Sequence, residues 1–341
     1  MGGNALKVPT RRYERTEFEE ISKELLDTLS KTFKRAEMPL YYKNKPSFGD
    51  ADILISTDGY NGNIRDYITD TFKPNEIVHN GNCYSFDYKE IQVDLITVSG
   101  ERFDTNIFYL SFNDMGNFIG KIAHGFGLKY GQDGLTYDHN FKGSNIGRVF
   151  ISKDYKKIFE FLDLSYDRYL QGFDELVDIF KFITASKYFN WEYVQLENNN
   201  KINRDRDKKR KSYNAFLEYI DNNVRDDIHK YEYFKDKSDY IPMINEFFPE
   251  ANLELEIRRL EYEHCRSLYI KAKFNGGDVM RNYGFKGKEL GDVLTGFKEF
   301  INNRFSNELA YDELMIINTK GIIYQFFELY LNTNNIKYEK N

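Results

Sequence analysis

The sequence predicts an α+β protein in which a mixed or antiparallel sheet, with helices on one side, is followed by an all-helical body. Three observations support this expectation. Strand-like segments are concentrated in the N-terminal part, an amphipathic helix precedes them, and from Lys153 onward large apolar residues recur at helical spacing. We therefore expect a sheet domain over 1–150, a helical middle domain over 151–250 and a helical C-terminal body over 251–341.

Composition limits the classes of protein that fit. The 341 residues include 27 Tyr and 29 Phe, enough for a sizeable core, and charges of both signs are interspersed. The two cysteines, Cys83 and Cys265, lack zinc-site spacing and suit a reducing compartment. No apolar run is long enough to cross a membrane, so a cytoplasmic protein is expected. The net charge of −6 argues against a general nucleic-acid binder, although a local basic patch could still bind one.

The first predicted element is a helix over 16–33. Its apolar residues recur every three or four positions and therefore share one face. Thr16 and Glu19 fit a capping box at its start. Three cationic residues precede this helix and could meet phosphates, although solvated charges are the commoner outcome: Arg11, Arg12 and Arg15.

A strand over 48–55 follows and carries two acidic residues near its beginning. Strand side chains alternate between faces, so Asp50 and Asp52 project together while the isoleucines that follow continue the opposite face. Two neighbouring carboxylates repel each other unless a cation lies between them, and oxygen ligands favour Mg²⁺ or Mn²⁺. The alternative interpretation is a turn followed by a strand, with both acids simply solvated.

A second acid-bearing strand is predicted over 91–98, and Asp94 is its one acidic residue. If this strand lies beside the first, its carboxylate joins those of Asp50 and Asp52. Two divalent ions about 3.5–4 Å apart, held by such a cluster, can clamp the attacking and leaving oxygens of an in-line phosphoryl transfer. The alternative is that Asp94 is a solvated residue at a sheet edge.

Turn residues and apolar spacing predict a series of further elements. Lys73-Pro74 ends a short helix, and Asn80-Gly81 joins two strands as a hairpin. The predicted strands are 76–79, 83–88, 107–112, 128–130 and 135–137. The predicted helices are 64–72, one that residues 113–117 open and that runs through 120–123, and 155–162, 173–185, 213–222 and 316–331.

The acid-bearing segments carry a resemblance to a known family. Gly-Asp-Ala-Asp-Ile-Leu-Ile at 49–55, followed by Gln-Val-Asp-Leu-Ile at 92–96, resembles the DNA polymerase β-type nucleotidyltransferase superfamily. The resemblance implies that the sheet domain is a nucleotidyltransferase palm with the three aspartates as catalytic metal ligands. The family also has a small-residue motif upstream of the paired acids, and Gly2, Gly3 and Asn4 fill that place, farther from the acids than is usual. They would hold a nucleoside triphosphate with the helix that follows.

A second resemblance covers 270–294. Its Asn-Gly-Gly-Asp turn and the spaced glycines after it are similar to the helical body of CCA-adding enzymes and poly(A) polymerases. Asp278 is expected to cap a helix that Gly284 ends. Lys286 and Lys288 lie at the following turn, where they could also meet phosphate.

Two further sets of residues are candidates for binding nucleotide or RNA. In that branch an Arg-Arg-Asp element faces the sugar of the incoming nucleotide; its arginines are absent here, and Asn117 and Lys121 are the substitutes we propose. The window 201–211 holds seven cations and two aspartates, a local charge of +5 that could grip a phosphate backbone or could be a solvated face. The candidate RNA-binding residues are Arg204, Arg206, Lys208, Lys209, Arg210, Lys286 and Lys288.

The two resemblances, in this order along the chain, imply a template-independent nucleotidyltransferase. It would use Mg²⁺ or Mn²⁺ to add nucleotides from an NTP, such as ATP or CTP, to the 3′ end of a tRNA or mRNA. The absent arginines favour an alternative acceptor, which could be a protein, a tRNA attacked by a toxin, or a small molecule. A third alternative is a silent binding or structural module on the same scaffold.

Overall fold

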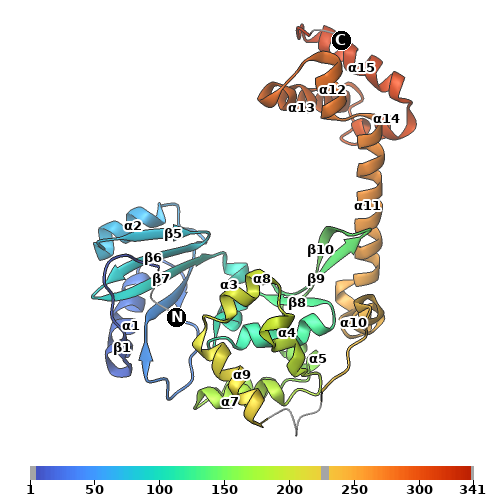
Figure 1. Cartoon of the computed structure of the whole chain (residues 1–341). Helices are drawn as coiled ribbons and strands as arrows, with labels where there is room; N and C mark the ends of the chain where they lie inside the picture. Colours follow the sequence, from blue (N-terminus) through green and yellow to red (C-terminus); the bar gives the residue numbers. More distant parts are fainter. Residues whose placement is uncertain (1–4, 224–229, 339–341) are drawn as a thin grey trace. The chain divides into compact units, whose positions relative to one another are not determined.

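The computed structural model describes residues 5–223 and 230–338 (Figure 1). The chain divides into two compact units. Unit 1 consists of Met1–His139 and Arg148–Glu254, and unit 2 consists of Asn140–Gly147 and Leu255–Asn341. The first two expected domains therefore share one unit, and the third expected domain begins close to the boundary between the units.

The centre of unit 1 is a mixed sheet, and the strand order found in the described residues is β2-β4-β7-β6-β5. Strands β4 and β7 are parallel, whereas the other neighbours are antiparallel. The two acid-bearing strands are thus direct neighbours, as the metal hypothesis requires. The strands of this sheet are β2 (Ala36–Glu37), β4 (Asp50–Ser56), β5 (Ile77–Asn80), β6 (Cys83–Tyr88) and β7 (Ile91–Val98).

One face of this sheet is covered by α1 (Arg15–Leu29) and α2 (Ile64–Phe72). The apolar residues of α1 share one face, as their spacing predicts, and they are buried against alternate residues of β4 and β7. This core includes Phe18, Ile21, Leu25, Leu29, Ala51, Ile53, Ile55, Ile68, Phe72, Val93 and Leu95.

The other face of the sheet carries α3 (Gly100–Leu110), so the expectation of helices on one side is wrong. The predicted strand over 107–112 is also wrong, because most of it is the last turn of α3. The apolar residues of this segment follow Phe103 at helical spacing. They pack against the apolar strand residues of this face, which shields both sets from water. The residues that pack here are Leu54, Ile96, Val98, Phe103, Ile107 and Leu110.

Two of the expected helix caps are wrong. The first helix begins before Thr16, and the Glu17 carboxylate accepts a hydrogen bond from the Glu14 backbone N–H at 3.3 Å. In unit 2, Asn275 caps its helix by accepting from the Asp278 backbone N–H at 2.9 Å. In both places the chain enters the helix earlier than expected, which leaves the expected capping residue in the first turn.

Apart from this sheet, the described chain up to residue 251 is mostly helical. The expected hairpin of β8 and β9 is confirmed, and β10, which the sequence analysis did not predict, adds to β9 as a third strand. A short pair, β1 with β3, lies just before β4 in the chain. The elements are β1 (Tyr13–Glu14), β3 (Ser47–Phe48), α4 (Met115–Gly125), β8 (Leu128–Gly131), β9 (Gly134–Phe141), β10 (Ser144–Ser152), α5 (Tyr155–Phe161), α6 (Tyr166–Gln171), α7 (Leu176–Thr184), η1 (Trp191–Val194), η2 (Leu196–Asn198), α8 (Lys201–Asp207), α9 (Lys211–Asn223), η3 (Lys237–Tyr240), α10 (Ile241–Phe247) and η4 (Pro249–Ala251).

Unit 2 is built mainly from helices around an aromatic core that includes Phe274, Phe297 and Phe327. Gly284 adopts a left-handed conformation, with φ of 78°, and ends a helix as expected. The expected single helix over 316–331 is wrong, because one helix ends and another begins within it. The helices are α11 (Leu253–Lys273), α12 (Gly276–Tyr283), α13 (Gly287–Arg304), α14 (Ala310–Ile317) and α15 (Lys320–Thr333). Among the helices described, none has both the length and the apolar composition to span a bilayer.

Candidate metal centre

The three aspartates predicted from the sequence meet at one end of the paired strands β4 and β7. In this parallel register Asp52 lies directly opposite Asp94, and Asp50 is two residues before Asp52 on the same face. Oxygen atoms of the three carboxylates lie within 4.8 Å of one another. Three oxygen donors at this separation could share a divalent cation.

Asp94 is oriented by residues of its own strand and of β6. The Gln92 amide donates hydrogen bonds to both carboxylate oxygens, at 2.9 and 3.1 Å. Ser85, which lies opposite Asp94 in β6, supplies a further hydrogen bond. Burial raises the pKa of Asp94, and the hydrogen bond from Ser85 opposes that rise. The carboxylate is therefore held in place, but its charge is only partly compensated.

Among the three aspartates, Asp52 has the least favourable environment for its ionised form. Its side chain keeps access to the solvent of a cavity, yet protein surrounds it on several sides. This loss of solvation raises its pKa, the neighbouring charges of Asp50 and Asp94 raise it further, and Lys45 opposes the rise. Ionised Asp52 thus costs free energy in the protein alone, and a bound divalent cation would remove that cost.

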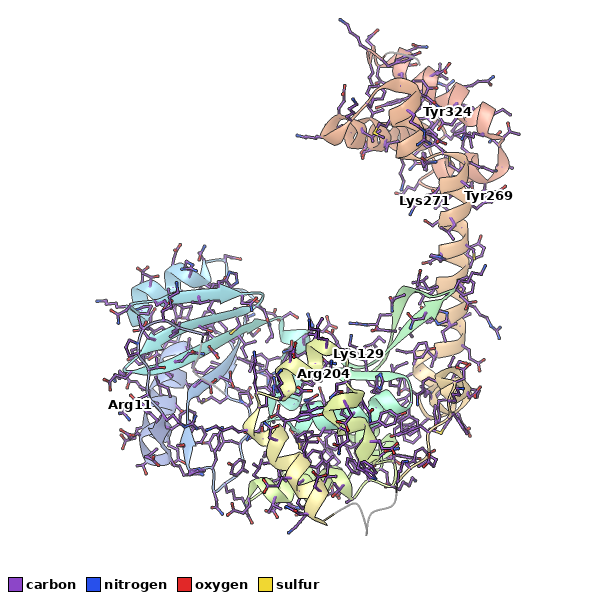
Figure 2. The ribbon with its side chains drawn as sticks, viewed as in Figure 1. Arg11, Lys129, Arg204, Tyr269, Lys271 and Tyr324 are labelled. Carbon is purple, nitrogen blue, oxygen red and sulfur yellow. The ribbon has the colours of Figure 1, made fainter. Side chains whose placement is uncertain are left out.

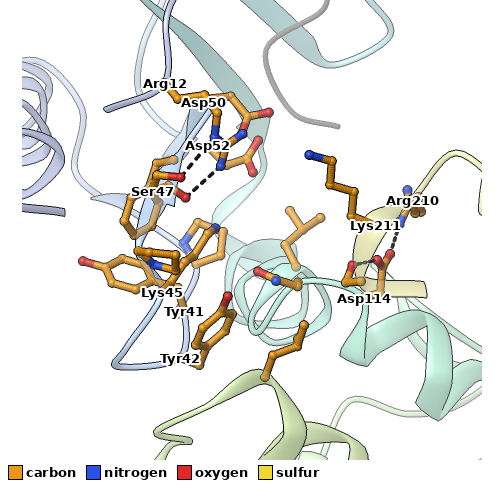
Figure 3. A pocket seen from close by; sticks show the side chains of 18 of the residues that line it. Arg12, Tyr41, Tyr42, Lys45, Ser47, Asp50, Asp52, Asp114, Arg210 and Lys211 are labelled. Carbon is orange, nitrogen blue, oxygen red and sulfur yellow. Dashed lines mark hydrogen bonds and ion pairs between the residues drawn. The ribbon is translucent and has the colours of Figure 1, made fainter. Parts of the chain in front are cut away.

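The acid cluster borders a cavity of about 1200 Å³. Asp50 and Asp52 line one side of it, and Lys209, Arg210 and Lys211 line the other, at the junction of α8 and α9. Figure 3 shows Lys211 extending from α9 toward the two aspartates, whereas Arg210 turns to Asp114. The cavity therefore places acidic and basic groups across a space that a phosphate ester could occupy.

Several cations of this cavity lack a carboxylate partner within the described part of the chain. Arg12 donates to the Ser47 hydroxyl at 3.1 Å and to its carbonyl at 2.9 Å (Figure 3). The Lys45 ammonium lies 4.4 Å from the centre of the Phe48 ring. Burial lowers the pKa of Lys45, while Asp50 and Asp52 raise it. No ion pair is found for Lys209 or Lys211 among the residues described.

The sequence analysis missed Lys45, and it named Arg12 as a possible phosphate contact without placing it beside the acids. Both line the same cavity as Asp50 and Asp52 because β1 pairs with β3, in the register Tyr13 with Phe48, and β3 leads directly into β4. A two-residue strand gives almost no sequence signal. The one indication for Lys45 is its position five residues before Asp50, with a proline between.

The predicted triphosphate-binding residues are distributed differently. Gly2, Gly3 and Asn4 lie outside the described residues. Asn117 and Lys121, both on α4, line a second pocket of about 610 Å³ rather than the cavity that contains the acid cluster. The structure therefore does not bring these two residues together with the aspartates.

The predicted RNA-binding residues fall into three groups. Lys209 and Arg210 line the cavity with Arg206, whose guanidinium is 2.7 Å from the buried Asp207 carboxylate. Lys208 pairs with Asp205 at 3.2 Å, and Arg204 is an exposed residue of α8 (Figure 2). The last two candidates belong to unit 2, where they begin α13: Lys286 and Lys288.

Comparison with known proteins adds no assignment. Neither a scan against models of protein families nor a search of curated proteins finds a match. Any function must therefore be argued from the residues of this site.

Proposed function

We propose that the chain is a divalent-metal-dependent nucleotidyltransferase that joins a nucleotide from an NTP to the 3′-hydroxyl of an RNA. The observation that carries this proposal is the cluster of three carboxylates at a cavity whose opposite side has lysines with no ion pair among the described residues. Phosphoryl transfer requires both features, because the acids bind metal and the cations neutralise phosphate charge. In this proposal the mixed sheet is a nucleotidyltransferase palm.

The donor set suits Mg²⁺ or Mn²⁺, which prefer carboxylate oxygens. Asp50, Asp52 and Asp94 would hold the metal. Without a metal, their mutual repulsion makes it unfavourable for all three carboxylates to be ionised. A bound metal would neutralise charge on the reacting phosphate and make the attacking hydroxyl more acidic. The hydrogen bonds from Gln92 and Ser85 keep one carboxylate in the orientation needed for this.

The reaction is an in-line displacement at the α-phosphorus. The acceptor oxygen forms a new bond to that phosphorus, the bond to the oxygen that bridges to the β-phosphorus breaks, and pyrophosphate leaves with its electron pair. The proton of the hydroxyl passes to solvent. Arg12 and Lys45 on the sheet side, with Lys209 and Lys211 on the helical side, would hold the triphosphate chain and the leaving pyrophosphate.

A labelling experiment tests both the reaction and the acceptor. The protein is incubated with Mn²⁺ or Mg²⁺, each of the four NTPs labelled at the α-phosphate, and total RNA. We expect label in RNA, released as a 3′-terminal nucleotide by exonuclease and absent when EDTA is added. Label in protein with unlabelled RNA would indicate the alternative acceptor. No label in any fraction, under all four NTPs, would reject the proposal.

The cavity lysines provide a charge test of the same site. Replacing Lys209 and Lys211 together by alanine is expected to raise KM for the NTP by about tenfold or more, because each lost charged hydrogen bond to phosphate weakens binding. Lys208→Ala is the matched control, since this lysine pairs with Asp205 and does not line the cavity. Equal effects of the double variant and the control would show that residues 201–211 act only through their overall positive charge, and that Lys209 and Lys211 do not contact the NTP specifically.

A further inference from the structure

The second pocket lies on the other side of Arg206, the one residue common to the linings of both cavities among the described residues. It is formed by the end of α3, one face of α4, the start of β8, the turns η1 and η2, and the start of α8. Its volume of about 610 Å³ falls within the range of small-molecule sites. None of the three aspartates of the metal centre lines it.

Amide side chains are concentrated in this pocket. Within the described residues Asn117 makes two long hydrogen bonds, 3.4 Å to Asp207 and 3.5 Å to Arg206, so its amide is weakly engaged there. An amide offers both a donor and an acceptor, which is what the edge of a nucleobase requires. Three other asparagines of the lining already use part of their amide within the protein, which leaves only the rest of each amide for a ligand. The asparagines in the lining are Asn117, Asn198, Asn199, Asn200 and Asn203.

Tyrosine rings provide the apolar surface. Tyr109 and Tyr130 lie with their ring centres 5.8 Å apart, and Tyr193 approaches His124 at 6.2 Å between ring centres. Aromatic side chains of this kind can stack against a planar heterocycle. Amides and tyrosines together favour a ligand with a flat, polar ring over a simple anion.

One cation in the pocket has no direct ion pair among the described residues, although the charge of Asp207 acts on it from nearby. Lys121 donates a hydrogen bond to the Asn199 side-chain oxygen, and no carboxylate pairs with it within the described ranges. The other charged groups of the lining are already paired: Lys129 with Asp138, Arg206 with Asp207, and Glu192 with Lys230. Burial lowers the pKa of Lys121, Asp207 opposes that shift and Arg206 adds to it, so the charged form is only partly compensated and a phosphate would stabilise it.

We infer that this second pocket binds a nucleotide, with the base against the asparagines and tyrosines and the phosphate against Lys121. The ligand is either a free nucleoside monophosphate or the terminal nucleotide of an oligonucleotide, because both present the same chemical group. The inference goes beyond the proposed reaction and does not depend on it, since the metal centre contributes no residue here.

Gly120 supplies a matched pair of variants for the test. A Cβ atom added there would lie 3.7 Å from the Tyr130 carbonyl oxygen, an ordinary contact, and nothing else is within 4 Å. Gly120→Ala should therefore be tolerated, and alanine favours the helix. Gly120→Leu extends the side chain into the pocket and should lower ligand affinity by about tenfold or more.

The single tryptophan is a built-in reporter, because Trp191 directly precedes the lining residues Glu192 and Tyr193. Its fluorescence is recorded during titration with each of the four nucleoside monophosphates, with a short oligoribonucleotide and with pyrophosphate, all in EDTA. We expect saturable binding that Gly120→Ala retains and that Gly120→Leu and Lys121→Met weaken. Circular dichroism and melting curves establish that the variants are folded.

The outcomes separate the two ligand sources and can reject the inference. Binding of a monophosphate indicates a free-nucleotide site, whereas binding of the oligoribonucleotide alone indicates a site for a nucleic-acid end. Absence of binding by both fluorescence and calorimetry would overturn the inference. Equal affinities of Gly120→Ala and Gly120→Leu, or pyrophosphate binding as tightly as any nucleotide, would overturn it as well.

Discussion

Asp52→Asn is expected to reduce nucleotidyl transfer by about a thousandfold or more, because the metal loses its central charged ligand. Asp52 lies between Asp50 on its own strand and Asp94 on the neighbouring strand, so no other residue of the cluster can replace its oxygen. The measurement is single-turnover transfer from an α-labelled NTP at saturating Mg²⁺. Asp27→Asn is the control: it removes the same charge from an exposed position of α1.

The same substitution should stabilise the metal-free protein, which separates loss of function from loss of fold. The pKa of Asp52 is raised in the folded state, so folding favours its protonated form, and the penalty on folding grows as the pH rises from the ordinary aspartate pKa to the raised value of about 8. Asparagine removes that penalty. We expect a higher melting temperature than wild type at alkaline pH in EDTA, with the difference shrinking as the pH falls. A lower melting temperature at every pH would mean that Asp52 is a structural residue.

The identity of the acidic residues could be predicted because it depends on short-range pattern. Two aspartates spaced by one residue in a β-rich segment must share a face, whatever the rest of the chain does. Asp94 was predicted from a pattern of equally short range, because it is the one acidic residue in an apolar strand. Their meeting depends on the parallel register of β4 and β7, which pairs Asp52 with Asp94. Periodicity alone does not determine that register, although a resemblance to a known family suggested it.

The errors occurred where a short segment is compatible with two structures. Residues 107–112 are rich in strand-forming types, yet they continue a helix whose apolar side covers the second face of the sheet. The preference of these residue types for strands was overridden by packing, because as a helix the segment buries Leu54, Ile96 and Val98 of the sheet. The neighbours of the site, Lys45 and Arg12, depend on a strand pair of two residues each, which leaves no periodic signal.

The second pocket shows a different limit of sequence reasoning. Asn117 and Lys121 were selected because they replace the arginines of a family motif, and they do share one face of α4. Their partners in the lining come from η1, η2 and α8, about eighty residues later in the chain. A contact of this range depends on how helices pack. The sequence could therefore select these residues as candidates, but it could not show that they line a different pocket from the aspartates.

Mn²⁺ is expected to raise the melting temperature of the wild-type protein, and to do so more strongly at higher pH. At a concentration about a hundred times its Kd, a ligand that binds only the folded state adds about 2.7 kcal/mol of stability, which corresponds to several degrees. Differential scanning fluorimetry over a pH series measures the shift. Asp94→Asn provides a second ligand variant, and Asp27→Asn is again the control.

The sign of the pH dependence follows from the raised pKa values of Asp52 and Asp94. Protons and metal compete for the same oxygens, so metal binding must displace any proton that remains at the working pH. A raised pKa keeps that proton bound to a higher pH than an ordinary aspartate would. The Mn²⁺-induced shift should therefore grow as the pH rises from about 6 to about 8.5 and be largely lost in Asp52→Asn. A shift that is independent of pH, or that persists in both variants, would place metal binding elsewhere and remove the basis of the proposed reaction.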